Sequence, residues 1–285
     1  MENSHIKNLS GIVLAALFIS TSGVLGKYIE MPSEVIVWFR SVFAAIFLYV
    51  FCKFKKIDLE IKSKKDLLPF VISALFMAAH WTTYFYALKM SNVALGMLSL
   101  YTFPVITALL EPFFVKTKFN PIHILLGILV LVGIYILAPE FTLENTHLKG
   151  ILFGVLSAFC YAIRILILKQ HIGNYNGSML MFYQTLIITI CFFPVLFLMD
   201  ISGFQSQFPY LILIALLTTA IGHTMMVYSL KHFSVSTASI ISSVQPIFGI
   251  IIAFFAVNEI PTFNTYIGGS LILITVIIES LRSKK

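Results

Sequence analysis

Charged side chains are scarce in this chain. Lys, Arg, Asp and Glu together make up 11% of its 285 residues, against about 25% in soluble domains. A soluble protein of this length needs a polar shell around its core, and so few charges, gathered in short stretches, cannot supply one. Because 59% of the residues are apolar, the composition predicts an all-α integral membrane protein with lipid around most of its surface.

Cysteines and metal-ligand patterns are also rare. The three cysteines, Cys52, Cys160 and Cys191, lie far apart inside apolar stretches, with no CxxC motif and no nearby histidine at ligand spacing. This pattern argues against a zinc site, so we expect the three thiols to be packing residues. The sequence predicts neither a metal nor a cofactor.

Catalytic signatures are missing as well. The chain has no HExxH, GxSxG or P-loop motif and no pair of carboxylates on one helix face. We therefore predict a protein that is not an enzyme, with a membrane-embedded enzyme and a channel or scaffold as the alternatives. The net charge of +7 does not indicate nucleic-acid binding, because the lysines sit between apolar runs, where they can orient spans.

Long apolar runs are what the sequence does contain. A helix needs about 20 predominantly apolar residues to cross the hydrocarbon core, and turn residues or charges divide this chain into ten such runs. The first run follows a short N-terminus with no A-x-A cleavage pattern, so we expect it to be a retained span. The predicted spans are residues 10–29, 34–52, 67–88, 93–115, 122–138, 148–168, 178–199, 209–230, 235–256 and 264–281.

The basic residues predict the orientation of these spans. With the N-terminus placed in the cytoplasm, the outside loops hold only Lys27, Lys89 and Lys149. The inside segments hold Lys7, Lys53, Lys55, Lys56, Lys62, Lys64, Lys65, Lys116, Lys118, Lys169, Lys231, Arg282, Lys284 and Lys285. This positive-inside bias predicts that both termini are cytoplasmic and that the chain is a multi-pass protein of the cell (inner) membrane.

One short sequence motif occurs twice. YALKMSNVA, residues 86–94, is followed 142 residues later by YSLKHFSVS, and Pro104 and Gly127 map to Pro246 and Gly269 at the same offset. The two copies are five predicted spans apart, and an odd number of spans inserts the second copy upside down. We therefore predict two inverted five-helix repeats, residues 1–143 and 144–285, with a binding site near the midplane where they meet and alternating access between the two sides.

The chain resembles the EamA family of the drug/metabolite transporter (DMT) superfamily. The resemblance rests on ten spans in two halves, the YxLK motif and the prolines after it. In that family a glutamate often ends the span that follows the proline, and Glu259 matches it. The first half departs from the pattern, because Thr117 stands at the equivalent place and Glu111 occurs earlier. The resemblance implies a secondary transporter of small organic metabolites, most often an exporter of amino acids or related compounds.

Polar side chains on spans four and nine are candidates for substrate binding. Ser239, Ser242, Ser243 and Pro246 share one face of span nine, with Gln245 beside it. The matching face of span four carries Tyr101 and Pro104. We expect the two faces to line the central cavity, because polar groups inside a span usually face a bundle interior. The alternative is ordinary helix packing, in which serine bonds its own backbone.

Spans three and eight each contain a histidine and hydroxyl cluster. His80 is accompanied by Trp81 and Tyr84, whereas His223 matches Trp81, not His80, at the 142-residue offset. An α-helix turns about 100° per residue, so we expect one histidine to face the cavity and the other to pack against protein. A proton-carrying role and a plain interhelical hydrogen bond are both open.

Three charged residues lie within predicted spans. Arg40 and Arg164 could hold a substrate carboxylate or pair with a structural acid or carbonyl, and both are candidate substrate-binding residues. Glu111 is the candidate for proton coupling, with pairing to Lys116 or Lys118 as its alternative. The predicted partners are a small-molecule metabolite, the lipid bilayer and, as a weaker expectation, protons; nucleic acid is not among them, and both a monomer and a homodimer fit the sequence.

Overall fold

Every regular element in the described residues is a helix or a helical turn. The structure is a computed structural model that describes residues 2–114, 121–137, 144–233 and 235–283. The first half contains α1 (Glu2–Tyr28), α2 (Ser33–Phe54), the 3-10 turn η1 (Lys64–Asp66), α3 (Leu67–Met90), α4 (Val93–Leu100), α5 (Phe103–Phe114) and α6 (Ile122–Leu137). The second half contains α7 (Thr146–His171), α8 (Gly177–Phe192), α9 (Val195–Leu198), α10 (Phe204–Leu213), the π-helix η2 (Ile214–His223), α11 (Thr224–Ser229), α12 (Val235–Ile241), the 3-10 turn η3 (Ser242–Val244), α13 (Gln245–Ala256) and α14 (Phe263–Ser283).

Eight of these helical segments are long and apolar enough to cross a membrane, and they coincide with eight of the ten predicted spans. They are residues 7–28, 33–54, 64–90, 93–114, 146–171, 177–198, 204–229 and 237–256. Where the fifth and tenth spans are predicted, the apolar helices are shorter, Leu125–Leu137 and Phe263–Thr275. The protein is therefore a multi-pass helical membrane protein, and a total of ten spans stays a prediction.

Asparagine side chains begin several helices. Asn92 accepts a hydrogen bond from the Leu95 amide, and Asn145 and Asn176 cap α7 and α8 in the same way. A side-chain oxygen at this place satisfies one of the backbone donors that the first helical turn leaves free. These caps therefore stabilise the first turns of α4, α7 and α8.

Three spans depart from regular α-helix near their middles. Spans four and nine break near their middles, before Pro104 and Pro246, because proline lacks the amide that would continue the helical ladder. Span eight contains the π-helical stretch η2, whose turns are wider than those of an α-helix. Irregular backbone inside a membrane protein is tolerated where it is buried in protein or lines a cavity, so these breaks direct attention to the centre of the bundle.

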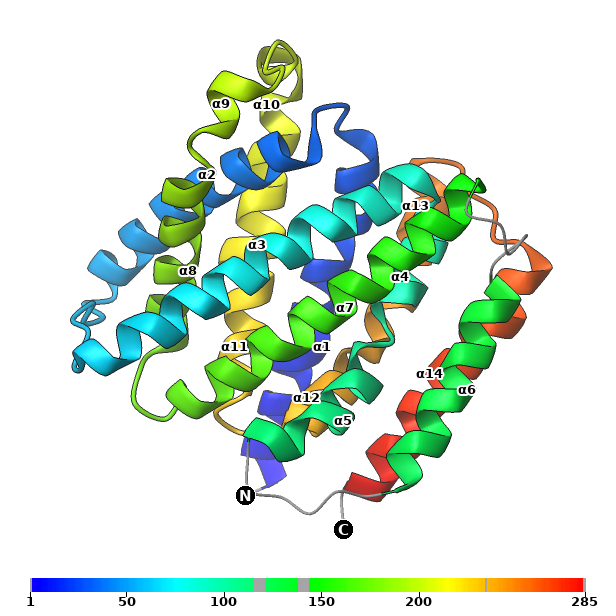
Figure 1. Ribbon diagram of the computed structural model, residues 1–285. Coiled ribbons are helices and arrows are strands. Elements are labelled where there is room, and N and C mark those ends of the chain that lie inside the picture. Colours follow the sequence, from blue (N-terminus) through cyan, green and yellow to red (C-terminus); the bar gives the residue numbers. More distant parts are fainter. Residues whose placement is uncertain (1, 115–120, 138–143, 234, 284–285) are drawn as a thin grey trace.

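The helices form one bundle, and α6 and α14 lie together at its edge (Figure 1). Helix α3 packs along α7 in the middle, α2 packs on α8, and spans four and nine contact each other through α4 and α13. The beginning of α1 and the end of α14 lie at the same end of the bundle, the lower end in Figure 1. The placement of both termini on the cytoplasmic side of the membrane stays a prediction.

Helices α6 and α14 form the edge pair, and glycines let them approach closely (Figure 1). A Cβ atom added at Gly268 would lie 2.7 Å from the carbonyl oxygen of Gly133, and one at Gly133 would meet the Ile272 side chain at the same distance. Small residues are typical of such contacts, because lipid supplies no hydrophobic force between helices and close packing must hold them together.

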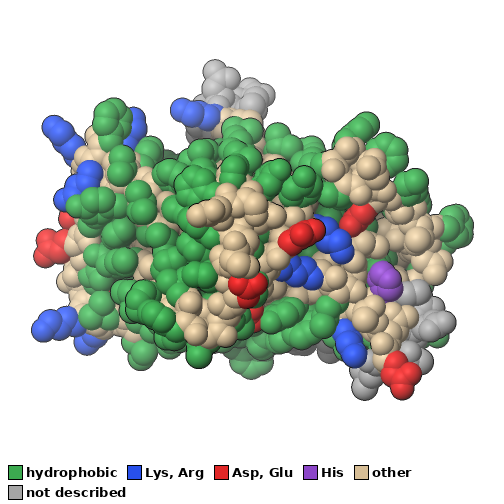
Figure 2. Space-filling view, turned by 90° about the horizontal axis from the view of Figure 1, so that it is seen from above, with side chains coloured by type: hydrophobic (Ala, Val, Ile, Leu, Met, Phe, Trp, Pro, Cys, Tyr) green, Lys and Arg blue, Asp and Glu red, His purple; other side chains and the backbone are tan. Residues whose placement is uncertain are grey.

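Hydrophobic side chains cover much of the outer surface, as the end-on view in Figure 2 shows, while the charged side chains form small groups. Phe113, Leu198 and Phe255 are more than three-quarters exposed, which suits lipid as the surrounding solvent. Cys52 and Cys160 are buried, as expected of packing residues. For Cys191 that expectation is wrong, because this residue lies on an exposed face of α8.

Candidate functional site

A small cavity lies at the centre of the bundle, where both halves of the chain contribute residues. Its volume is about 20 Å³, which is room for about one water molecule. Pockets for small organic ligands measure about 300–1,000 Å³. The cavity is lined by Ile19, His80, Leu100, Tyr101, Phe103, Tyr161, His223 and Gln245.

The breaks in spans four and nine bring polar groups to this cavity. The Tyr101 hydroxyl donates to the carbonyl oxygen of Ser242 at 2.8 Å, which joins the two broken spans across the halves. The hydroxyls of Ser242 and Ser243 both donate to the carbonyl oxygen of Ser239 in their own span. The cavity-facing side chain of span nine is thus Gln245, whereas two of the predicted serines bond their own backbone.

Both predicted histidines line the cavity. His80 Nδ1 lies 2.7 Å from Ser157 Oγ, and the same hydroxyl donates to the His80 carbonyl oxygen at 2.8 Å. Because that hydroxyl has one hydrogen to give, the hydrogen between the ring and Ser157 belongs to His80 Nδ1. The expectation that only one histidine faces the cavity is therefore wrong. The 100° turn on which it rests holds for an α-helix, and His223 ends a π-helix.

His223 is held by a neighbour from the other half. Trp81 Nε1 donates to His223 Nε2 at 3.4 Å, and the two residues are 142 positions apart in the chain. The hydrogen of a neutral His223 therefore sits on Nδ1, a buried atom that has no hydrogen-bond partner among the described residues. Trp81 and His223, which are equivalent at the 142-residue offset, therefore contact each other where the two halves of the chain meet.

Arg40 reaches the same region from α2. Its guanidinium donates to the hydroxyls of Thr219 at 2.6 Å and Thr218 at 2.8 Å and stacks 4.0 Å from the centroid of the Trp81 ring. The wide turns of η2 let two adjacent threonines serve one guanidinium. One nitrogen of Arg40, Nη1, is buried without a hydrogen-bond partner among the described residues.

Arg164 of α7 has a similar environment. It donates twice to Gln184 Oε1, at 3.2 and 2.8 Å, and lies 3.1 Å from the Met181 sulfur. Gln184 is in turn oriented by Ser73, to whose hydroxyl it donates at 3.0 Å. The guanidinium carbon is 5.5 Å from the centre of the Tyr161 ring, and Arg164 Nη1 again lacks a partner among the described residues.

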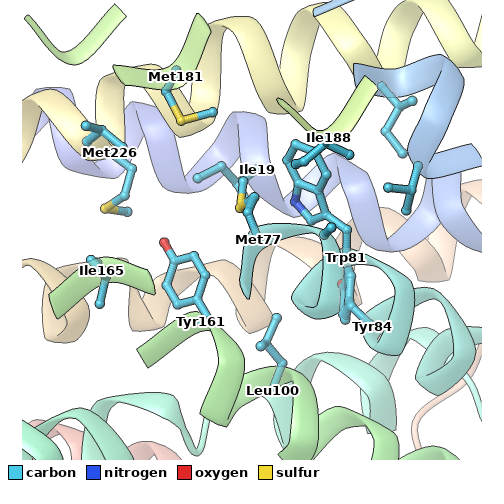
Figure 3. Close-up of a cluster of buried hydrophobic side chains, with 14 of the residues drawn as sticks. Ile19, Met77, Trp81, Tyr84, Leu100, Tyr161, Ile165, Met181, Ile188 and Met226 are labelled. Carbon is cyan, nitrogen blue, oxygen red and sulfur yellow. The ribbon is translucent and has the colours of Figure 1, made fainter. Parts of the chain in front are cut away.

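Aromatic and methionine side chains surround these polar groups. Figure 3 shows Trp81 and Tyr161 extending from α3 and α7 towards one buried space, near Met77, Met181 and Met226. The rings of His80 and Tyr161 are 4.8 Å apart, as are those of Tyr161 and Phe103. Flexible methionines can adapt to ligands of different shape.

Other predicted site residues lie away from the cavity. Tyr84 is buried beside Ser22 of α1, and Pro104 and Pro246 are buried in the first turns of α5 and α13. Glu111 lies near the end of α5, only partly buried, and does not line the cavity. The structure thus separates the candidate proton-coupling acid from the cluster of arginines and histidines.

Two lysines make the same contacts in the two halves. Lys27, in the last turn of α1, donates to the carbonyl oxygens of Leu88 and Ser91, both at 2.9 Å. Lys169, in the last turn of α7, donates to those of Leu230 at 2.7 Å and Phe233 at 2.9 Å. The sequence separations are 61 and 64 residues in both cases. A lysine placed this way satisfies carbonyl groups that a helix end leaves free.

The glutamate of the second half also has a structural partner. Glu259 Oε2 accepts a hydrogen bond of 2.7 Å from the backbone amide of Val93, the first residue of α4. This bond connects the end of span nine to the beginning of span four and therefore crosses between the halves. Thr117, at the equivalent place in the first half, lies outside the described residues.

Sequence reasoning missed several residues of this region. Phe103 and Ile19 line the cavity and Gln184 holds Arg164, yet the first two are apolar and Gln184 belongs to no polar helix face in the sequence. The 142-residue offset could have found Phe103, because it pairs with the predicted residue Gln245. Ile19 pairs with Tyr161 at the same separation. No comparable signal points to Gln184.

A larger groove of about 470 Å³ lies between α13 and α14. Its walls are largely aliphatic and aromatic side chains, among them Ile251, Phe255 and Leu273, and no charged side chain lines it. Ligand sites combine apolar walls with a few polar groups that fix orientation. Since the central cavity gathers histidines, tyrosines and a glutamine, we place the candidate site there and not in the larger groove.

Comparisons with known proteins agree with a transport role. The sequence profile of the EamA-like transporter family matches residues 7–138 and again residues 148–281. The chain is 22% identical to an S-adenosylmethionine uptake transporter of Rickettsia conorii, covering 99% of this chain and 95% of the relative. It is 20% identical to a pseudopaline exporter of Pseudomonas aeruginosa, covering 97% of each. A protein of known crystal structure aligns with a TM-score of 0.71 over 98% of both chains at 15% identity.

Proposed function

The chain belongs to the EamA-like transporter family, and we propose that it is a secondary transporter of small organic metabolites that works by alternating access around the central cavity. The most favoured cargo is an amino acid or a related metabolite. The observation that carries the proposal is the position of the cavity, which residues of both halves line, including two pairs equivalent at the 142-residue offset: Ile19 with Tyr161 and Phe103 with Gln245.

The proposal needs two inverted repeats, residues 1–143 and 144–285. Three observations support this symmetry. The family profile matches the chain twice, the contacts of Lys27 recur at Lys169, and Trp81 meets His223, its equivalent, at the centre. Repeats related by an axis in the membrane plane make a shape open to one side nearly equivalent to a shape open to the other.

The two lysine contacts are the candidate gates. Lys27 joins the last turn of α1 to the junction of α3 and α4, and Lys169 joins the last turn of α7 to the junction of α11 and α12. The first junction lies at the upper end of the bundle in Figure 1 and the second at the lower end. The cavity holds about one water molecule's volume, so a metabolite can enter only after the halves separate at one end. Breaking one lysine contact while the other persists would open the cavity to one side only.

The relatives differ in the direction of transport for which they are named. One relative is named for uptake and another for export, so the family alone does not give a direction. We propose export across the cell membrane with cytoplasmic termini, in line with the lysine distribution of the sequence. Proton coupling through Glu111 or a cavity histidine is a secondary proposal, since histidine titrates near neutral pH.

Transport by purified protein in proteoliposomes tests this function. We expect vesicles loaded with a metabolite extract to exchange labelled amino acids or related metabolites, and the exchange to change when a pH gradient is imposed if protons are coupled. Thiol labelling of cysteines placed at positions 89 and 231 should find them on opposite sides of the membrane. Labelling from one side only would contradict the inverted repeat, and exchange of no metabolite at all would contradict the transport function.

A further inference from the structure

We propose that the central site binds a small organic anion that carries two negative charges, held between Arg40 and Arg164. This inference rests on the proposed transport function, since it names the class of cargo for the same cavity. Dicarboxylates and phosphate monoesters share the required chemistry, and among amino acids only the acidic ones, which carry two carboxylates, meet it.

The first observation is the burial of two permanent positive charges. Arg40 is 1% exposed and Arg164 is 0% exposed, and arginine stays protonated in proteins. The groups that accept their hydrogen bonds are neutral: two threonine hydroxyls, one glutamine oxygen and one methionine sulfur. No Asp or Glu among the described residues contacts either guanidinium.

A buried charge without a counter-ion is costly, and two of the same sign cost more. Arg40 and Arg164 lie close enough to interact electrostatically, and His80 and His223 lie within reach of both. A structural role would favour an acidic partner or a neutral replacement at these positions. A cluster with an uncompensated charge of +2 is instead complementary to a ligand that brings two negative charges.

The second observation is the type of polar group left over. Arg40 Nη1, Arg164 Nη1 and His223 Nδ1 are buried atoms without a hydrogen-bond partner among the described residues. The two guanidinium nitrogens can only donate, and His223 Nδ1 donates because Nε2 accepts from Trp81. Three unused donors favour a ligand rich in acceptor oxygens, such as a carboxylate or phosphate group.

The third observation is how the arginines stand relative to the cavity. Neither arginine lines the cavity, but each contacts an aromatic ring near it: Arg40 stacks on Trp81, which bonds the cavity residue His223, and Arg164 lies 5.5 Å from the ring of Tyr161, which lines the cavity. Since Arg40 comes from the first half and Arg164 from the second, a dianion between them would draw both halves to one ligand.

Binding can be measured in the purified, full-length protein with a charge series of one shape: succinate, its monoamide and its diamide, with glycerol 3-phosphate as the phosphate probe. The chain has two tryptophans, Trp38 and Trp81, so Trp38→Phe leaves Trp81 as a single fluorescent reporter stacked on Arg40. We expect succinate or glycerol 3-phosphate to change this fluorescence with at least tenfold higher affinity than the monoamide and at least 100-fold higher than the diamide. Comparing succinate with the phosphate probe tells which acid group is preferred.

Arginine variants sharpen the test. Arg40→Gln and Arg164→Gln should each weaken dianion binding at least tenfold, Arg40→Lys should lose less, and Lys149→Gln at an exposed lysine should change nothing. The fluorescence series in the Trp38→Phe background does not depend on whether the glutamine variants fold.

Equal affinity for succinate and its diamide would overturn the anion assignment, as would proteoliposomes that exchange phenylalanine or arginine but neither dianion. The transport function would survive both results. Proteoliposomes that exchange no solute of any charge would instead overturn the transport function, so the two failures are distinguishable.

Discussion

The two ends of the bundle use the same lysine contact but are otherwise held differently. At the end around Lys27, Glu259 also binds the Val93 amide, and Lys89 donates to the carbonyl oxygen of Met31. At the end around Lys169, the equivalent of Lys89 is Lys231, which is exposed. The lysine contact is thus shared by both ends, whereas the further bonds come from different residues at each end: around Lys169, for example, Gln170 Nε2 donates to the carbonyl oxygen of Phe114 at 3.0 Å.

The cavity shows a similar division between the halves. Where the first half contributes Ile19 and Phe103, the second contributes Tyr161 and Gln245 at the equivalent positions. At these two pairs of positions the first half is apolar and the second polar, although His80 and Tyr101 of the first half also line the cavity. The difference implies that the two open states of a transporter built this way need not have equal free energy.

Removing the shared lysine contact should have the largest effect on this balance. Lys27→Met leaves two carbonyl groups without their charged donor, and a hydrogen bond to a charged group contributes about 1.5–3 kcal/mol. We expect opening at the Lys27 end to become about 10- to 100-fold more favourable, and Lys169→Met to do the same at the opposite end. A reporter cysteine at the cavity residue Leu100, in a background without the native cysteines, measures this with impermeant thiol reagents added from either side.

The control for this pair is Lys149→Met, which removes an exposed lysine and should leave labelling unchanged. Opposite shifts in Lys27→Met and Lys169→Met are the decisive result. If both variants made Leu100→Cys reactive from the same side, the lysines would not act as gates at opposite ends.

The sequence predicts the helices of this protein better than it predicts the contacts of the candidate site. Apolar runs and proline or asparagine breaks locate the helices, because lipid and backbone hydrogen bonding impose those features locally. The sequence also predicts Arg40, Arg164 and both histidines as site residues, because charged and titratable side chains are rare within the apolar spans. It could not show that Thr218 and Thr219 hold Arg40, or that His223 meets Trp81, because these contacts depend on how η2 is wound and on which helices cross.

The extra bond at the Lys27 end should have a smaller effect than the lysines. Glu259→Ala removes the acceptor for the Val93 amide, and the loss of a side-chain cap costs about 1 kcal/mol. We expect it to shift the reporter cysteine towards reactivity from the Lys27 end by about fivefold, with Glu259→Gln giving less because its amide oxygen can still accept.

The reverse change tests the asymmetry itself. Thr117 stands 142 residues before Glu259, so Thr117→Glu places an acid at the equivalent position of the first half. Reactivity of the reporter cysteine from the Lys169 end should then fall. An increase, or an unchanged ratio between the two sides in both variants, would show that the glutamate does not distinguish the ends.

The smallest expected difference concerns Gly127 and Gly269, which are equivalent positions in the fifth and tenth predicted spans. A Cβ atom at Gly127 would find its nearest neighbour at 3.9 Å, an ordinary contact, whereas one at Gly269 would lie 2.8 Å from a methyl carbon of Leu98. Gly127→Ala should therefore stabilise the helix by up to about 1 kcal/mol through helix propensity. In Gly269→Ala the displacement of Leu98 should offset that gain, leaving the thermal unfolding temperature in detergent level or slightly lower. Equal stabilisation by Gly269→Ala and Gly127→Ala would contradict this difference. The tenth predicted span would then pack no more tightly against span four than the fifth span packs against its own neighbours.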